Sequence, residues 1–313
     1  MHSNPTNTCH LPIITLKMTL LITSLLLTLT NLTHAQNKDP HPNTLRVMTY
    51  NIWHVFAKGK EVEAGCQFIK EQSPDVVALQ ELTSIKPERL QELASNWEHP
   101  HSSLLKTNGF SVGLTSRWPI EVVEKGFSGM HHGYLHAKTN GVHYFVVHLS
   151  PFKWEVRHRE ADLLCKKIAP LLRQNESVIV LGDFNALTPD DRRWLESKDN
   201  ANLLESKLQT DARHAHVQNL KGGKFEYGVL QKFHELGLVD TAKNHLPEKV
   251  EARLTSPTGV WDDKKTAVKK GQRIDFILAS KDLYRKVKGC KIITEGEVNK
   301  ISDHYPVITD FNK

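Results

Sequence analysis

Cysteine is scarce in this chain and is not arranged for metal binding. Four cysteines occur among 313 residues, and Cys66, Cys165 and Cys290 lie far apart. This spacing excludes the close cysteine pairs of a structural zinc site. Because Cys9 falls in a leader-like segment, at most one disulfide can form among the other three. Disulfides are therefore not expected to hold the fold together.

Repeats, biased tracts and long apolar runs are also missing, with one exception near the N-terminus. The run "MTLLITSLLLTLTNL" (18–32) follows Lys17 and is succeeded by small residues before Gln36. A basic residue, an apolar stretch too short to cross a bilayer and small residues after it are typical of a secretory signal peptide. We predict a signal peptide over residues 1–35, a linker over 36–44 and export to the periplasm or the extracellular space. Met18 is an alternative start.

A strong charge of either sign is absent as well. The formal net charge is +6, and removing residues 1–35, whose only charged side chain is Lys17, lowers it to +5. This modest surplus suits an anionic substrate, although a solvated surface explains it equally well.

Apolar strands alternate with amphipathic helices through the rest of the chain, and no clean boundary divides them. Residues 45–313 are therefore predicted to form one α/β domain. Asn140-Gly141 is a hairpin signal between two of the strands. A polar segment over 187–237 is expected to be an insertion with short helices and a loop that covers or lines a site. Strands are expected at 45–53, 74–82, 110–116, 133–139, 142–150, 177–185, 273–280, 288–294 and 305–311, and helices at 60–72, 86–95 and 155–174.

Polar residues recur where these buried strands begin or end. Any one of them is explained as a turn residue or a cap, but so many at the same kind of position point to a shared site, because α/β folds assemble their sites at strand ends. The residues are Asn51, Glu81, His148, Asp183, Asn185, Asp275, Asp303 and His304.

The segments that contain these residues resemble the endonuclease/exonuclease/phosphatase superfamily, the DNase I-like group. The motifs "TYNIW", "LQE", "VHL", "GDFN", "RIDFIL" and "SDHYPV" occur in that order between residues 45 and 311. The resemblance implies a four-layer sandwich, in which two packed mixed β-sheets are flanked by helices. It also implies hydrolysis of phosphoester bonds. The "VHL" motif resembles that of DNase I-like nucleases, sphingomyelinases and several phosphatases, whereas exonuclease III-like repair enzymes carry a tyrosine-containing motif there.

The resemblance assigns Glu81, Asn51 and Asp303 to a metal site. An all-oxygen ligand set suits Mg²⁺, with Mn²⁺ as a plausible substitute. A cation is needed because a phosphodiester is negatively charged and repels hydroxide.

The resemblance also implies roles for the remaining strand-end residues. Asp183 orients or deprotonates the attacking water, and Asn185 donates to the phosphate. His304 acts on the phosphoryl group and is oriented by Asp275. His148 protonates the leaving group with help from a carboxylate that the sequence does not identify.

Other basic and histidine residues are weaker candidates. Arg157 and Arg159 follow His148 closely enough to meet a phosphate, but surface pairing with nearby glutamates is slightly favoured for them. His131 and His132 lack a second cluster that would make a metal site. Four loop lysines could follow a polyanion, although a solvated loop is favoured: Lys264, Lys265, Lys269 and Lys270.

Three functions remain open on these grounds. The leading hypothesis is an exported Mg²⁺-dependent phosphodiesterase, with nucleic acid favoured as substrate and no obligate protein partner. A sphingomyelinase-type phospholipase C or a phosphatase acting on a small phosphoester is the alternative, and only this alternative brings a membrane surface into play. A binding protein that uses an inactive copy of the fold is disfavoured, because the set of site residues is complete.

Overall fold

The computed structural model describes residues 41–261 and 263–313, so the predicted signal peptide lies outside the described residues. In the described part, no helix is both long enough and apolar enough to cross a membrane. The strands are β1 (Thr44–Asn51), β2 (Val76–Gln80), β3 (His101–Leu104), β4 (Gly113–Ser116), β5 (Glu121–Gly126), β6 (Tyr134–Thr139), β7 (Val142–His148), β8 (Val178–Asp183), β9 (Val239–Asp240), β10 (Asp275–Ala279), β11 (Val287–Ile292) and β12 (Val307–Asn312). The helices are α2 (Phe56–Gly59), α3 (Val62–Gln72), α4 (Pro87–Asn96), α5 (Trp154–Arg173), α6 (Arg192–Leu195), α7 (Ala201–Arg213), α8 (Gly228–Leu236), α9 (Lys264–Lys269), α10 (Lys281–Tyr284) and α11 (Val298–Ile301), with short 3₁₀ turns at Pro189–Asp191, Lys198–Asn200 and Val250–Ala252.

Twelve strands form two mixed six-stranded sheets within the unit 43–313. The first sheet has the order β11-β12-β1-β2-β4-β3 and the second β5-β6-β7-β8-β10-β9. Each has one parallel pair near its centre, β1 with β2 and β7 with β8, while its other neighbours are antiparallel. These central strands are buried along almost their whole length, which explains their near-continuous apolar sequences.

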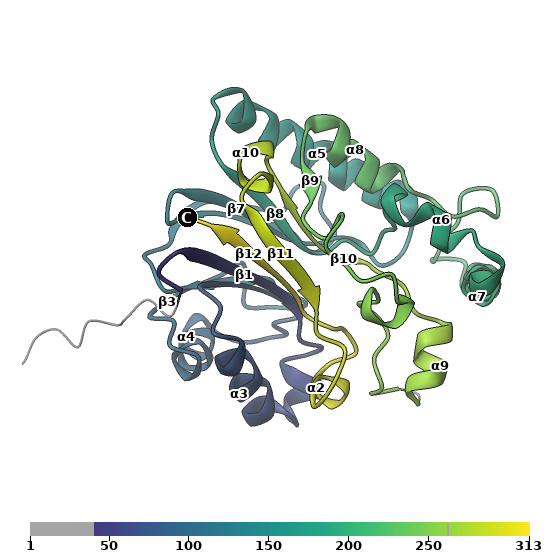
Figure 1. The fold of residues 1–313 in the computed structure, drawn as a ribbon, viewed down its shortest axis with the longest axis horizontal. Helices are drawn as coiled ribbons and strands as arrows, with labels where there is room; N and C mark the ends of the chain where they lie inside the picture. The colour runs from purple at the N-terminus through teal and green to yellow at the C-terminus, as the bar shows by residue number, and fades with distance from the viewer. Residues whose placement is uncertain (1–40, 262) are drawn as a thin grey trace, which may run out of the picture. The chain divides into compact units, whose positions relative to one another are not determined.

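Helices cover the outer faces of the two packed sheets (Figure 1). Helices α3 and α4 contribute Ile69, Leu90 and Leu93 to the large core cluster that includes both inner sheet faces. Helices α5 and α8 pack Leu164, Ile168 and other apolar residues against the outer face of the second sheet. The predicted four-layer α/β sandwich is confirmed.

Three edge strands and the inserted segment differ in detail from the prediction. Strands β3, β5 and β9 were not predicted, because an edge strand has one free side and need not carry a continuous apolar sequence. Strand β5 is accordingly polar and largely exposed. The segment 187–237 contains short helices, as expected, together with the longer α7 and α8. Cys66, Cys165 and Cys290 are free thiols.

Candidate active site

Strand register brings three of the predicted residues into one row. In the second sheet, Asp183 at the end of β8 lies opposite His148 of β7 on one side and Asp275 of β10 on the other. Opposed residues in neighbouring strands project from the same face of a sheet, so the three side chains share one space. Gly182 has φ +141° and lies so close to β7 that a Cβ atom would stand 2.0 Å from the Val147 carbonyl oxygen. The glycine of the "GDF" motif therefore permits the close strand approach beside this row.

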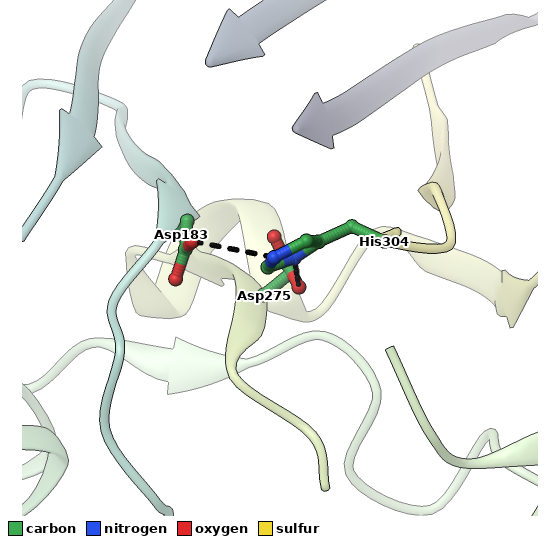
Figure 2. A group of neighbouring side chains, drawn as sticks. All are labelled: Asp183, Asp275 and His304. Atoms are coloured by element: carbon green, nitrogen blue, oxygen red, sulfur yellow. Dashed lines mark hydrogen bonds and ion pairs between the residues drawn. The ribbon is translucent and has the colours of Figure 1, made fainter. Parts of the chain in front are cut away.

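His304 joins the row from the loop that precedes β12. Its Nδ1 lies 2.8 Å from Asp275 Oδ2, and its Nε2 lies 3.8 Å from Asp183 Oδ2 (Figure 2). Burial disfavours the charged imidazole, but the two carboxylates outweigh burial and raise the pKa of His304 well above its usual value. The raised pKa favours the protonated ring, in which the Nδ1–H would be donated to Asp275 Oδ2 and the Nε2–H would face Asp183.

Asp183 lies at the centre of the group and is almost completely buried. Its Oδ1 accepts the backbone N–H of Asn185 at 2.8 Å, and its Oδ2 accepts from Asn51 Nδ2 at 3.1 Å. Burial, followed by the negative charge of Asp275, raises the pKa of Asp183, while His304 and these hydrogen bonds oppose the shift. The raised pKa makes Asp183 a better proton acceptor than an exposed aspartate.

His148 approaches Asp183 from the other side. Its Nε2 lies 3.5 Å from Asp183 Oδ2, and its ring stacks on the buried His132 at a centroid distance of 4.3 Å. Burial, followed by the positive charge that His132 would carry, lowers the pKa of His148 well below its usual value. Among the described residues no partner reaches His148 Nδ1, so the expected carboxylate is not found there. The nearby buried Glu160 instead accepts two backbone N–H groups.

Asn185 follows the row on a turn with a positive φ of 47°. Its Nδ2 donates to the Leu149 carbonyl at 3.1 Å, which leaves one amide N–H for another acceptor. The predicted donation to a phosphate is compatible with this geometry and stays a prediction.

The three residues assigned to the metal lie beside this row. Asn51 Nδ2 also contacts Glu81 Oε1 at 3.3 Å, and Asp303 Oδ2 accepts from the exposed indole Nε1 of Trp261 at 3.2 Å. In the described structure the buried oxygens Glu81 Oε2 and Asp303 Oδ1 have no hydrogen-bond partner, and His54 Nε2 lies 3.8 Å from Glu81 Oε2. Burial raises the pKa of Glu81, and Asp303 adds to the shift. These two carboxylates lie near enough to interact electrostatically, and each has a buried oxygen without a hydrogen-bond partner. A divalent cation would bind both oxygens and neutralise their charge, so these residues fit a metal ion.

A second group of possible ligand atoms lies within the row itself. One ligand atom each from Asp183, Asp275 and His304 lie within 4.8 Å of one another. In this group His304 Nδ1 is already paired with Asp275 Oδ2 at 2.8 Å, whereas Glu81 Oε2 and Asp303 Oδ1 are buried without a hydrogen-bond partner among the described residues. The pair Glu81 and Asp303 is therefore the better position for a cation, and the row is better described as a hydrogen-bonded acid–histidine group.

The two candidate arginines have different environments. Arg157 is only 3% exposed, and its Nη1 donates to the Ser150 carbonyl at 3.0 Å, two residues after His148. The favoured expectation of surface pairing is therefore wrong for Arg157, because the fold closes over its position on α5. Arg159 is exposed and lines a surface groove with Lys166 and Lys167 on α5, rather than the space around the strand ends.

The loop lysines are exposed on and just after α9, as the solvated reading expected. Lys264 forms an ion pair with Glu295. The other members of this exposed group are Lys265, Lys269 and Lys270.

The sequence analysis gave no site role to several residues that the structure places around the candidate site. Lys207 of α7 lies near Arg157, and burial together with that positive charge lowers its pKa to about 8. His132 was considered only as a metal ligand, and Trp53 was given no role although it ends the "TYNIW" motif. Lys207 and His132 stand in none of the motifs, and the surroundings of all three residues depend on how the loops fold over the strand ends.

Fold and site together define a class of protein. Two packed mixed sheets carry, at one set of strand ends, an acid–histidine group and a pair of carboxylates that fits a cation. These are the groups that hydrolysis of a phosphoester requires.

Residues 48–304 match the profile of the Endonuclease/Exonuclease/phosphatase family, so the chain belongs to this family. Members of the family are metal-dependent hydrolases that act on phosphoester bonds. The resemblance inferred from the sequence motifs is thereby confirmed. None of the curated proteins matches the chain.

Several solved structures share the fold at low sequence identity. An AP endonuclease from Archaeoglobus fulgidus is similar with a TM-score of 0.64 and 18% identity, covering 86% of this chain and 100% of that one. A 3′ phosphatase from Neisseria, solved with a product DNA hairpin, has a TM-score of 0.61 and 17% identity, with the same coverage of both chains. A 3′-5′ exonuclease from Neisseria meningitidis has a TM-score of 0.59 and 19% identity, again with this coverage. At these identities the likeness establishes the fold alone.

Proposed function

We propose that this protein is an exported, Mg²⁺-dependent phosphodiesterase that cleaves nucleic acid. The observation that carries the chemical part is the position of Asp183, which lies between His148 Nε2 at 3.5 Å and His304 Nε2 at 3.8 Å. Two imidazoles and one carboxylate with a raised pKa thus face a common space next to a cation-binding pair of carboxylates.

Glu81 and Asp303 would hold the cation, with the Asn51 side chain keeping Glu81 in position. A bound Mg²⁺ would neutralise charge on the phosphoryl oxygens. Asp183 would accept a proton from the attacking water, because its raised pKa favours protonation in the buried site. His304 would donate its Nε2–H toward a phosphoryl oxygen, and Asp275 would hold the ring and stabilise its charge. His148 would present Nε2 to the leaving oxygen from the opposite side of Asp183.

Nucleic acid is favoured as substrate for three reasons. The predicted mature chain has a positive net charge, and basic residues lie near the site. Three structural neighbours are an AP endonuclease, a 3′ phosphatase bound to a product DNA hairpin and a 3′-5′ exonuclease. Buried Arg157 adds positive charge near Asp183, and half-buried Lys207 lies near Arg157, which together favour a polyanion. A phosphatase or a sphingomyelinase-type activity is the alternative that the test must separate.

A substrate panel tests this proposal. DNA, RNA, sphingomyelin, bis-p-nitrophenyl phosphate and a phosphomonoester are each incubated with Mg²⁺, Mn²⁺ or EDTA. We expect cleavage of DNA or RNA with either metal and none with EDTA. Asp183→Asn and His304→Ala should each lower turnover by about 10²–10⁴-fold, the range for a positioned acid or base. Hydrolysis of the lipid or the monoester without cleavage of nucleic acid would refute the proposed substrate.

The export proposal rests on the leader pattern of residues 1–35 and needs its own test. Cells that produce the full chain are fractionated, and the N-terminus of the recovered protein is sequenced. We expect a mature protein that begins at Gln36 outside the cytoplasm. A cytoplasmic protein that retains residues 18–35 would contradict export.

A further inference from the structure

An exposed aromatic side chain stands directly beside the carboxylates assigned to the metal. Trp261 precedes α9 and is 56% exposed, more than any other large apolar side chain in the described part of the chain. Its indole Nε1 donates to Asp303 Oδ2 at 3.2 Å, so one edge of the ring is tied to the reaction centre. Its exposed surface therefore lies where groups attached to the phosphate would pass.

A second indole completes an aromatic pair. The rings of Trp53 and Trp261 lie 4.6 Å apart between centroids, at an angle of 62°. The ammonium group of Lys58 lies 5.3 Å from the Trp53 ring centroid. The partly buried indole of Trp53, the exposed indole of Trp261 and the Lys58 ammonium group thus lie together on the Asp303 side of the site. We call Trp53 and Trp261 the tryptophan pair.

The backbone that presents Trp53 is conformationally unusual. Six consecutive residues that are not glycine, from Trp53 at φ +38° to Lys58 at φ +60°, have left-handed backbone angles. This conformation is disfavoured for every L-residue, and most of all for β-branched Val55. Such a segment persists only where its surroundings determine it, and such segments cluster at functional sites.

The contacts that determine this left-handed turn come from the site itself. Asn51 Oδ1 accepts the backbone N–H of Trp53 at 3.1 Å, and the Glu81 carbonyl accepts that of Val55 at 3.2 Å. Phe56 is fully buried and packs edge-on against Tyr50. Phe56 belongs to the large core cluster, whereas Trp53 is only partly buried, lies outside that cluster and contacts the exposed Trp261. Core packing therefore explains the position of Phe56, and the indole of Trp53 is instead placed beside Trp261.

We propose that the tryptophan pair is a stacking platform for a nucleobase of the nucleotide next to the scissile phosphate. Flat indole faces bind bases of any identity by stacking, and a neighbouring cation suits the phosphodiester to which the base is attached. The tie from Trp261 to Asp303 fixes the platform at the reacting phosphate rather than at a distant surface. This inference rests on the proposed cleavage of nucleic acid and names the feature of the substrate that the site recognises.

The test compares strands with and without bases, and it is run in EDTA so that binding is measured apart from cleavage. A fluorescently labelled short oligothymidylate is compared by anisotropy with the same sugar-phosphate backbone in which every base is absent. Stacking on an aromatic contributes enough per base that the base-bearing strand should bind wild type about 5- to 150-fold more tightly. The measured quantity is this affinity ratio, in which losses of backbone contact cancel.

Matched variants test whether the tryptophan pair is responsible for the ratio of the two affinities. Trp261→Leu should reduce the ratio to near one, whereas Trp261→Phe, which keeps a ring but loses the N–H to Asp303, should retain most of it. Phe127→Leu alters another exposed aromatic, 48% exposed after β5, and should leave the ratio at its wild-type value. A Trp261→Leu protein with the wild-type ratio would overturn the platform, as would loss of the ratio in Phe127→Leu.

Failure of the platform and failure of the proposed function give different results. A wild-type protein that cuts nucleic acid in Mg²⁺ but binds both strands equally refutes the platform alone. A protein that cuts no nucleic acid and instead binds phosphatidylglycerol vesicles through Trp261 refutes both, in favour of a membrane-facing indole.

Discussion

Substitution of Asp275 by asparagine tests the acid–histidine pair most directly. The Asp275 carboxylate lies 2.8 Å from His304 Nδ1, and both side chains are less than a tenth exposed. A hydrogen bond to a charged group contributes about 1.5–3 kcal/mol, against about 0.5–1.5 kcal/mol for a neutral one. Asparagine keeps the shape and an acceptor oxygen but removes the charge. The hydrogen bond that stabilises the protonated, oriented ring of His304 should therefore weaken by about 1–1.5 kcal/mol.

That loss corresponds to about a tenfold change in the equilibrium. We expect Asp275→Asn to lower turnover by about tenfold. This effect is smaller than that of His304→Ala, because Asp275 orients the ring and does not itself contact the phosphate. The substitution also removes the main charge that raises the pKa of His304. The alkaline limb of the rate profile, where protonated His304 is lost, should therefore move to lower pH.

The same pair predicts the pH dependence of stability. A histidine whose pKa is raised on folding stabilises the protein below its unfolded pKa of about 6.5, and this contribution is lost as the pH rises through the folded pKa. The deficit of Asp275→Asn in unfolding free energy should thus be largest near pH 6 and smaller at alkaline pH. Urea unfolding in EDTA at several pH values measures it. An unmoved alkaline limb together with a pH-independent deficit would refute the charged-pair assignment.

Three further predictions concern the metal, the polyanion and the core. Exhaustive dialysis against EDTA should abolish hydrolysis and Mg²⁺ or Mn²⁺ should restore it, and full activity after dialysis would contradict the assignment of Glu81 and Asp303. The logarithm of the binding constant for DNA or RNA should fall with the logarithm of the salt concentration, with a slope of about −0.7 to −0.9 per phosphate contacted. The double variant Lys265→Ala/Lys269→Ala should flatten this slope, which is measured by titration at several salt concentrations. An unchanged slope would show that the nucleic-acid strand does not contact α9. Burial lowers the pKa of His99 to about 4, so between pH 6.5 and 4 the unfolded protein binds a proton there and the folded protein does not. The free energy of unfolding of wild type should therefore fall by up to about 3 kcal/mol over this pH range. His99→Gln lacks this contribution, and urea midpoints that fall equally steeply with acidification in both proteins would show that His99 is not responsible.

Short sequence segments were sufficient for much of the fold and for the list of candidate residues. Strands buried on both faces must be nearly continuous in apolar residues, so β1, β2, β7 and β8 were readable from local pattern alone. The polar residues that interrupt these strands at their ends stand out for the same reason. The motifs around Asp183 and His304 then indicated the family, whereas polar edge strands such as β5 gave no comparable signal.

The arrangement of those residues was decided only by the tertiary structure. Asp275 and Asp183 meet because β10 and β8 pair in one register, and Trp261 reaches Asp303 across 42 residues of chain. Arg157 looks like a surface residue in sequence and is buried in the structure. Sequence periodicity reports whether a residue faces a core or solvent, but it does not report which distant side chains share a space. Partners therefore follow from strand register and loop closure, which are properties of the whole folded chain.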